Sequence, residues 1–266
     1  MSDGHEAEPR VDCTVDTDGR IVLVLRHLTA TERPRVLLRL RPKKGGPETD
    51  LHHLDTEPGA DGRHTAVLPT GTVLTEGRWD LYLLRAPDGE RHRLRPGPRD
   101  LRALVDGHVR DWPAPVAVRV PYTTKDGFLA VRSWLRTAHA EAAGMTFTGR
   151  SATVRARLHG VTADERATVR LRLRGTDVVR TLPVEVDADG RDFRFTAAYG
   201  ELTAGVWDVS VRPTDDVPPV RIARLLDDVA DRKEVFVYPE AVVDGCAVRP
   251  YYTVDNDLSL SVTARG

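Results

Sequence analysis

The feature that most constrains this chain of 266 residues is an internal repeat, because two similar halves must each complete a similar fold. Segments of the first half recur in the second half in the same order, at offsets between 128 and 133 residues. The recurring segments are 28–33 with 161–166, 61–63 with 189–191, 74–80 with 202–208, and 122–123 with 252–253. This order predicts a tandem duplication.

The repeat divides the chain into three parts. We expect one copy at residues 11–127 and a second copy at residues 151–266. Residues 128–150 match neither copy, and we expect them to form a connector that begins with a strand. The length of each copy suits one β-sandwich.

Apolar and polar residues alternate within each copy, as in Val169–Arg174 and Phe193–Phe195. A period of two places one face of a strand in a core and the other in water. Asp-Gly pairs separate several of these runs, and Asp-Gly favours hairpin turns. We therefore predict an all-β fold of two tandem immunoglobulin-like antiparallel β-sandwiches. Short helical turns are expected only near residues 100–109 and 222–229.

Charge and composition exclude several classes of protein. The 39 basic and 40 acidic residues give a net charge of −1, which provides no general attraction to nucleic acid. The longest aliphatic run, Ile21–Leu25, is far shorter than the ~20 residues of a membrane-spanning helix. The first ten residues are polar and do not resemble a signal peptide, so we expect a cytoplasmic protein in which Cys13 and Cys246 stay reduced.

Motifs of the common catalytic and cofactor sites are missing from the sequence. It contains no nucleophile elbow, no phosphate-binding loop and no dinucleotide-binding glycine motif. Asp-x-Asp triplets stand at turns, and His52, His53 and His64 lack the spacing of a zinc site. We therefore predict no metal site and no cofactor.

Tyrosines at the end of each copy are the strongest candidates for a ligand-binding surface. Each lies beside short polar residues, and an exposed ring with polar neighbours is typical of a surface that binds a sugar. The alternative is that these tyrosines pack at a domain boundary. The candidate binding residues are Tyr122, Asp126, Tyr251, Tyr252, Asp255 and Asn256.

The segments around these tyrosines also support a resemblance. Residues 121–129 and, in degenerate form, 250–258 resemble β-rich modules of actinobacterial proteins described loosely as transferases, and residues 136–141 resemble the start of such a module. The resemblance implies an accessory module of wall-polymer systems of the teichoic-acid type, which contain glycosyltransferases and glycerophosphotransferases. An arginine-rich composition, with four lysines among 39 basic residues, agrees with a GC-rich actinobacterial genome.

Three functions remain open from the sequence. We expect first a non-catalytic protein that binds a glycan or glycerol-phosphate polymer, or a wall-polymer synthesis enzyme, with two sites per chain. The alternative is a transferase with its site between the copies, in which His139 and Glu141 act as an acid/base pair and Arg136 holds an anionic donor. A third possibility is an assembly protein that pairs through exposed strand edges.

Overall fold

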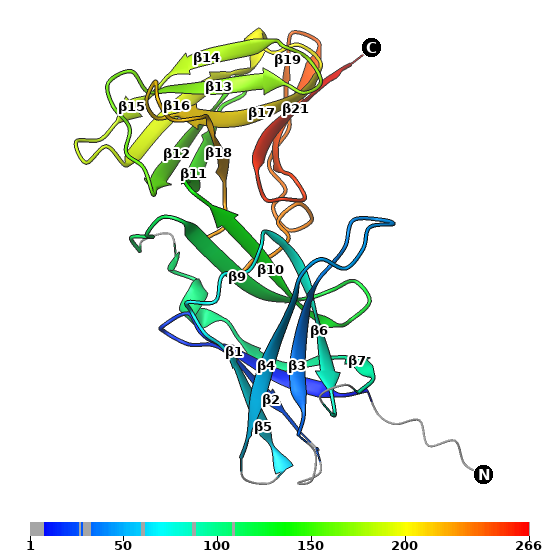
Figure 1. The fold of residues 1–266 in the computed structure, drawn as a ribbon. Coiled ribbons are helices and arrows are strands. Elements are labelled where there is room, and N and C mark those ends of the chain that lie inside the picture. The colour runs from blue at the N-terminus through cyan, green and yellow to red at the C-terminus, as the bar shows by residue number, and fades with distance from the viewer. Residues whose placement is uncertain are drawn as a thin grey trace. The chain divides into compact units, whose positions relative to one another are not determined.

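The chain folds into two compact β-rich units (Figure 1). The computed structural model describes residues 8–26, 28, 33–59, 62–86, 89–107 and 110–265. Unit 1 lies within residues 1–107 and 117–135, and unit 2 within residues 108–116 and 136–266. The predicted all-β sandwich fold class is confirmed. Residues 29–32, Asp61 and Asp88, on which parts of the repeat and turn predictions fall, lie outside the described residues.

In the described residues of unit 1, ten strands follow the order β8-β1-β2-β5-β4-β3-β6-β10-β9, with β7 paired to β6. Their bounds are β1 Arg10–Val15, β2 Ile21–Leu25, β3 Arg35–Leu40, β4 Leu51–Pro58, β5 His64–Leu68, β6 Gly77–Leu84, β7 Arg91–Arg93, β8 Arg95–Asp100, β9 Val116–Thr123 and β10 Leu129–Arg136. A 3-10 turn, η2 at Arg102–Leu104, follows β8. It lies within the helical turn expected near residues 100–109, of which residues 108 and 109 lie outside the described residues.

Unit 2 contains eleven strands in the order β15-β16-β12-β11-β18-β17-β21-β20-β19, with β13 paired to β17 and to β14. Their bounds are β11 His139–Phe147, β12 Ser151–His159, β13 Thr168–Leu173, β14 Val179–Pro183, β15 Glu185–Val186, β16 Asp192–Ala198, β17 Gly205–Arg212, β18 Val220–Ala223, β19 Ala241–Val243, β20 Cys246–Tyr252 and β21 Leu258–Ala264. A 3-10 turn, η4, spans Tyr199–Glu201. No helix forms at 222–229, where β18 ends and an irregular segment begins.

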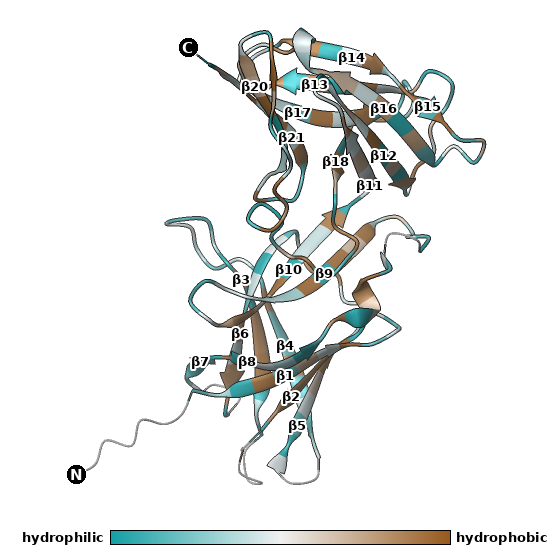
Figure 2. Ribbon diagram, turned by 180° about the vertical axis from the view of Figure 1, so that it is seen from behind, coloured by the Kyte–Doolittle hydropathy of each residue, from teal (hydrophilic) through white to brown (hydrophobic). Residues whose placement is uncertain are grey.

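Alternation along β17 explains how unit 2 forms its core. Trp207, Val209 and Val211 are fully buried and belong to the hydrophobic core, whereas Asp208 and Ser210 point to the opposite face of the sheet. The hydropathy of each residue is drawn along the strands in Figure 2. Successive side chains of a strand point to opposite faces, so this sequence forms one apolar and one polar face.

The central strand pair has the same register in both units. Leu40 of β3 is opposite Trp79 of β6, and Leu173 of β13 is opposite Trp207 of β17. Each tryptophan donates its indole N–H to a carbonyl four residues earlier, Trp79 to Thr75 at 3.0 Å and Trp207 to Thr203 at 2.9 Å. These positions are related by the offsets of 133 and 128 that occur in the sequence.

One strand in each unit departs from the expected antiparallel pairing. β8 pairs in parallel with β1, and β18 pairs in parallel with β11. β18 also pairs antiparallel with β17, so it joins the two layers of unit 2. The first residues of β18, Val220 and Arg221, pair with β17, and its last residues, Ile222 and Ala223, pair with β11.

The segment 128–150, expected to connect the copies, supplies one strand to each unit. β10 pairs with β6, and its Leu129 and Val131 enter the core of unit 1. β11 pairs with β12, and its Ala140 and Ala142 enter the core of unit 2. The alternating apolar residues of this segment therefore complete both sandwiches.

Replacing Trp207 with phenylalanine should lower the free energy of unfolding by about 1–3 kcal/mol, because the change leaves a space in the core and removes the donor to the Thr203 carbonyl. Urea unfolding followed by circular dichroism measures the change. Val237→Ala, at a side chain that is 77% exposed, serves as the control with little expected effect. Equal stability of the wild type and Trp207→Phe would show that the indole of Trp207 does not stabilise unit 2.

Candidate functional site

A row of polar side chains crosses the outer face of the unit 2 sheet. Arg172 of β13 is opposite Asp208 of β17, Asp208 is opposite Ser259 of β21, and Ser259 is opposite Tyr251 of β20. Opposed residues of neighbouring strands point to the same face. The row therefore places Tyr251, a predicted binding residue, on the same face as a group of arginines.

Asp208 lies at the centre of this row. Its carboxylate accepts hydrogen bonds from Arg174 at 2.5 Å and from the Ser259 hydroxyl at 3.0 Å, and Arg221 lies 3.3 Å away. Burial acts to raise the pKa of Asp208, but the bond from Arg174 and the charge of Arg221 outweigh it and lower the pKa. Asp208 therefore remains ionised and fixes the surrounding arginines. Tyr251 contributes to the raised pKa of Arg174, to a smaller extent than Asp208.

Unit 1 has a similar group around Asp80. Arg41 at 2.5 Å, and Arg39 and Arg93 at 3.3 Å each, form ion pairs with this buried carboxylate. Although burial opposes the shift, the hydrogen bond from Arg41 and the charges of Arg41 and Arg93 lower the pKa of Asp80. Burial raises the pKa of nearby Tyr122, whose hydroxyl has no hydrogen-bond partner among the described residues.

The hairpins that carry the candidate tyrosines differ in one detail from the predicted repeat. The N–H of Gly127 donates to the Thr124 carbonyl, and the N–H of Asn256 donates to the Thr253 carbonyl. Gly127 and Asn256 both have left-handed backbone conformations, with φ of 80° and 62°. These equivalent turns are 129 residues apart, so Tyr122 corresponds to Tyr251 rather than to Tyr252.

A hollow of about 350 Å³ lies beside Tyr251 in unit 2. It combines aromatic rings, hydroxyl groups and charged groups, contributed by β20, β21 and the segment before β19. Its lining includes Lys233, Phe236, Tyr238, Glu240, Arg249, Tyr251, Ser261 and Thr263. Glu240 pairs with Arg249 at 2.9 Å, which fixes two of the charged groups. We name this feature the Tyr251 hollow.

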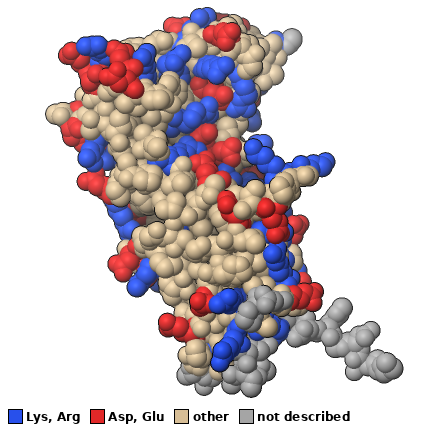
Figure 3. Space-filling model, viewed as in Figure 1, with Lys and Arg blue, Asp and Glu red and all other residues tan. Residues whose placement is uncertain are grey.

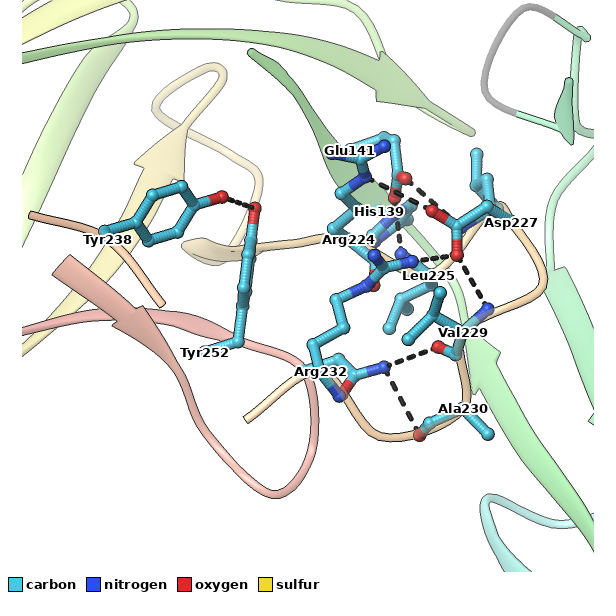
Figure 4. Close-up of polar contacts among 12 residues, drawn as sticks. His139, Glu141, Arg224, Leu225, Asp227, Val229, Ala230, Arg232, Tyr238 and Tyr252 are labelled. Atoms are coloured by element: carbon cyan, nitrogen blue, oxygen red, sulfur yellow. Dashed lines mark hydrogen bonds and ion pairs between the residues drawn. The ribbon is translucent and has the colours of Figure 1, made fainter. Parts of the chain in front are cut away.

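Tyr252, by contrast, is 1% exposed and belongs to the core of unit 2. The Tyr238 hydroxyl donates to the Tyr252 hydroxyl at 3.4 Å (Figure 4). Burial raises the pKa of Tyr252 far above its ordinary value. In this structure the ring of Tyr252 therefore offers no face to a ligand.

Asn256 is fully buried and holds the irregular segment between β18 and β19. Its side-chain oxygen accepts the Arg232 backbone N–H at 3.1 Å, and its amide nitrogen donates to the carbonyls of Val229 and Ala230 at 3.3 and 3.5 Å. The oxygen and the nitrogen of the Asn256 amide thus both form hydrogen bonds within the protein. The other polar candidates, Asp126 and Asp255, are exposed in the turns of the two hairpins.

His139 and Glu141 lie side by side, as their spacing on one strand predicts, and both are buried. The imidazole Nε2 and the Glu141 Oε2 are 2.7 Å apart. The same carboxylate accepts the backbone N–H groups of Leu225 at 2.7 Å and Leu226 at 3.2 Å. Figure 4 shows Glu141 among these groups. Arg136 does not join this pair but forms an ion pair with Asp257 at 3.0 Å.

Sequence reasoning missed Asp227 and Arg232, which form a buried ion pair in the same region (Figure 4). The Arg232 Nε donates to the Arg224 carbonyl at 2.6 Å, and its guanidinium lies 5.0 Å from the centroid of the Phe236 ring. The helical turn predicted at residues 222–229 does not form, and residues 230–240 carry no periodic pattern, so the sequence did not indicate these contacts. Together with Glu141 and Asn256, this pair positions one wall of the Tyr251 hollow.

Comparison with known proteins assigns no family, because no family model matches the chain and no curated protein matches its sequence significantly. Within the part of the chain that the structure describes, no group of three or more His, Cys, Asp or Glu side chains is placed to hold a metal ion. No helix among the described residues has the length and apolar character needed to cross a membrane. Cys13 and Cys246 are both free thiols.

Lowering the pH from 6.5 to about 4 should destabilise unit 2 through His159. Burial, and then the charges of His139 and Arg157, lower the pKa of His159 from 6.5 to about 4. In this window the unfolded chain binds a proton at His159 that the folded unit does not, which lowers the free energy of unfolding by about 1.4 kcal/mol per pH unit. Above pH 6.5 and below about pH 4, the contribution of His159 to the free energy of unfolding does not change with pH.

Urea unfolding at stepwise pH tests this effect. His159→Phe should flatten the pH dependence within the window, whereas His53→Phe, at an exposed imidazole, should leave it unchanged. A pH dependence that is the same in the wild type and His159→Phe would show that His159 does not cause it.

Asn256→Gly should lower the free energy of unfolding by about 1–3 kcal/mol, because glycine keeps the backbone conformation but leaves the partners of the amide unsatisfied. Asp244→Gly is the matched control, since Asp244 also has a positive φ, of 50°, but lies exposed in a turn. Chemical unfolding measures both changes. If the two substitutions have the same effect, the side-chain bonds of Asn256 do not hold the segment.

Proposed function

We propose that this chain is a non-catalytic protein that binds a glycan or glycerol-phosphate polymer, and that unit 2 binds it at the Tyr251 hollow. The observation that carries this proposal is the combination of Tyr251, Tyr238 and Phe236 with the hydroxyls of Ser261 and Thr263 in one hollow. Aromatic rings cover the apolar face of a sugar, and short polar side chains bond to its hydroxyls. Lys233 adds a positive charge that suits an anionic polymer.

The type of polymer follows from the sequence resemblance rather than from the hollow. Residues 121–129 and 250–258 resemble modules of wall-polymer systems, and the second of these segments contains Tyr251. We therefore propose a polymer of the teichoic-acid type, which contains sugars and glycerol phosphate. A wall-polymer synthesis enzyme is the partner that such a module would accompany.

Binding is favoured over transfer by the state of the predicted acid/base pair. His139 and Glu141 are 0% and 1% exposed, and the Glu141 carboxylate is already bonded to two backbone N–H groups. A general acid or base needs hydrogen-bond access to its substrate. The contacts of this pair support a structural role, in which it fixes the start of the segment 224–240.

We also propose that the two units arose by duplication of one sandwich. The equal registers of β3 with β6 and β13 with β17 support this origin, as do the equivalent hairpin turns 129 residues apart. The units have since diverged at the tyrosine positions, because the hydroxyl of Tyr122 is buried whereas Tyr251 lines a hollow.

Tyr251→Ala should weaken retention on a sugar-substituted glycerol-phosphate polymer by about tenfold, because removing the ring that covers the sugar costs roughly 1.4 kcal/mol of binding free energy. Retention on the same polymer without sugars should not change. Affinity electrophoresis in gels that contain the polymer measures retention, and Tyr251→Phe should retain most of it. Tyr122→Ala, at the equivalent position of unit 1, is the matched control and should bind as the wild type does. Normal retention of a folded Tyr251→Ala protein would refute the proposed site.

A further inference from the structure

A second hollow, of about 390 Å³, lies on the outer face of unit 2 beside Ser210. Its lining includes Arg170 and Arg172 of β13, Asp208 and Ser210 of β17, and Arg221 of β18. Figure 3 shows basic side chains over these strands. We name this feature the Ser210 hollow, and it shares no lining residue with the Tyr251 hollow.

The equivalent place in unit 1 is filled, and strand register explains the difference. Tyr82 of β6 stands between Leu37 of β3 and Arg93 of β7 in the same way that Ser210 stands between Arg170 and Arg221. In unit 1 the guanidinium groups of Arg39 and Arg93 lie 5.1 and 5.5 Å from the centroid of the Tyr82 ring.

Tyr82 and Leu37 are both buried there and pack together. In unit 2 the serine has no ring to occupy this space, and an arginine replaces the leucine. The flanking guanidinium groups therefore face an open hollow.

The charges of this hollow favour an anion. The carboxylate of Asp208 is neutralised by Arg174 and Arg221. No hydrogen bond or ion pair joins the Arg170 guanidinium to another residue in the described part of the chain. Arg172 donates from Nε only to the Thr176 carbonyl, at 3.3 Å. The guanidinium groups of Arg170 and Arg172 thus form no ion pair with a carboxylate of the described residues. Besides Asp208, the acidic residue that lines the hollow is Asp177, whose side chain is exposed.

We infer that the Ser210 hollow is a binding site for the phosphate group of a phosphoester, held by Arg170, Arg172 and Arg221. A guanidinium presents its N–H donors in a fixed planar arrangement that matches two oxygens of a phosphate. Three such groups around a small polar side chain leave room for a tetrahedral anion, while the Ser210 hydroxyl itself donates to the Arg170 carbonyl at 3.5 Å. The inference does not rest on glycan binding at the Tyr251 hollow.

Isothermal titration calorimetry of the full chain with glycerol 3-phosphate tests this site, with glycerol as the uncharged comparison. We expect one phosphate site per chain and no binding of glycerol. Binding of poly(glycerol phosphate) in the same assay distinguishes a polymer ligand from a free phosphoester, and tighter binding per phosphate indicates the polymer. Absence of glycerol 3-phosphate binding, or equal binding of glycerol, would overturn the inference.

Ser210→Tyr is the most specific variant, because it fills the hollow as Tyr82 does in unit 1 without changing the charge. Arg170→Leu reproduces Leu37 of unit 1 and provides a second test if the tyrosine impairs folding. Arg170→Leu should weaken binding of glycerol 3-phosphate by about tenfold, the effect expected from losing one charge-assisted contact. Ser210→Tyr should weaken it at least as much, because the ring occupies the space of the phosphate. Arg180→Leu removes an equal charge from β14 outside the lining and should bind as the wild type does.

Two further variants complete the test. Asp177→Asn should tighten binding, since it removes a negative charge near the phosphate, and unchanged or weaker binding would count against the site. Tyr251→Ala should leave the affinity for glycerol 3-phosphate unchanged, so failure of the glycan proposal and failure of the phosphate site are separate results. Wild-type affinity in folded Ser210→Tyr and Arg170→Leu proteins would overturn the inference.

Discussion

The structure of each unit depends on a central strand that packs an apolar core on one face and holds charged side chains on the other. In β6 and β17 a tryptophan is followed directly by an aspartate, and the pleat sends the two side chains in opposite directions. Trp79 and Trp207 fill the cores, whereas Asp80 and Asp208 gather arginines on the outer faces. A shift of one residue in register would turn the carboxylate into the apolar core and the indole toward the arginines of the outer face. The core and the polar face therefore stabilise the same strand pairing.

This constraint made much of the fold predictable. The alternation at Val169–Arg174 predicted a strand with one buried face, and the Trp-Asp segments predicted equivalent strands in the two copies. The same rule separates Tyr251 from Tyr252, because adjacent residues of β20 must point to opposite faces. Sequence alone did not show whether Tyr251 or Tyr252 points into the core. The answer depends on the pairing of β20 with β21, in which Leu260 and Val262 lie inside.

Residues 224–240 could not be predicted, for a different physical reason. Their positions depend on buried groups supplied by strands far away in the sequence, such as Glu141 of β11, which binds the N–H groups of Leu225 and Leu226. The side chain of Asn256 forms hydrogen bonds with the same segment, at Val229, Ala230 and Arg232. Local patterns do not record such distant partners. The hollow beside Tyr251 is therefore a product of tertiary contacts and not of any motif.

The position of β18 also affects which strand edges unit 2 exposes. Since β18 pairs with both β11 and β17, that side of unit 2 presents no long row of free backbone groups to a second molecule. The strand path instead ends at β15 and β19, of two and three residues, and unit 1 ends on one side at β8, which contains Pro96 and Pro98. Short or proline-containing outer strands are poor templates for amyloid-like growth. Edge-to-edge pairing between two molecules is therefore disfavoured at β8, β15 and β19.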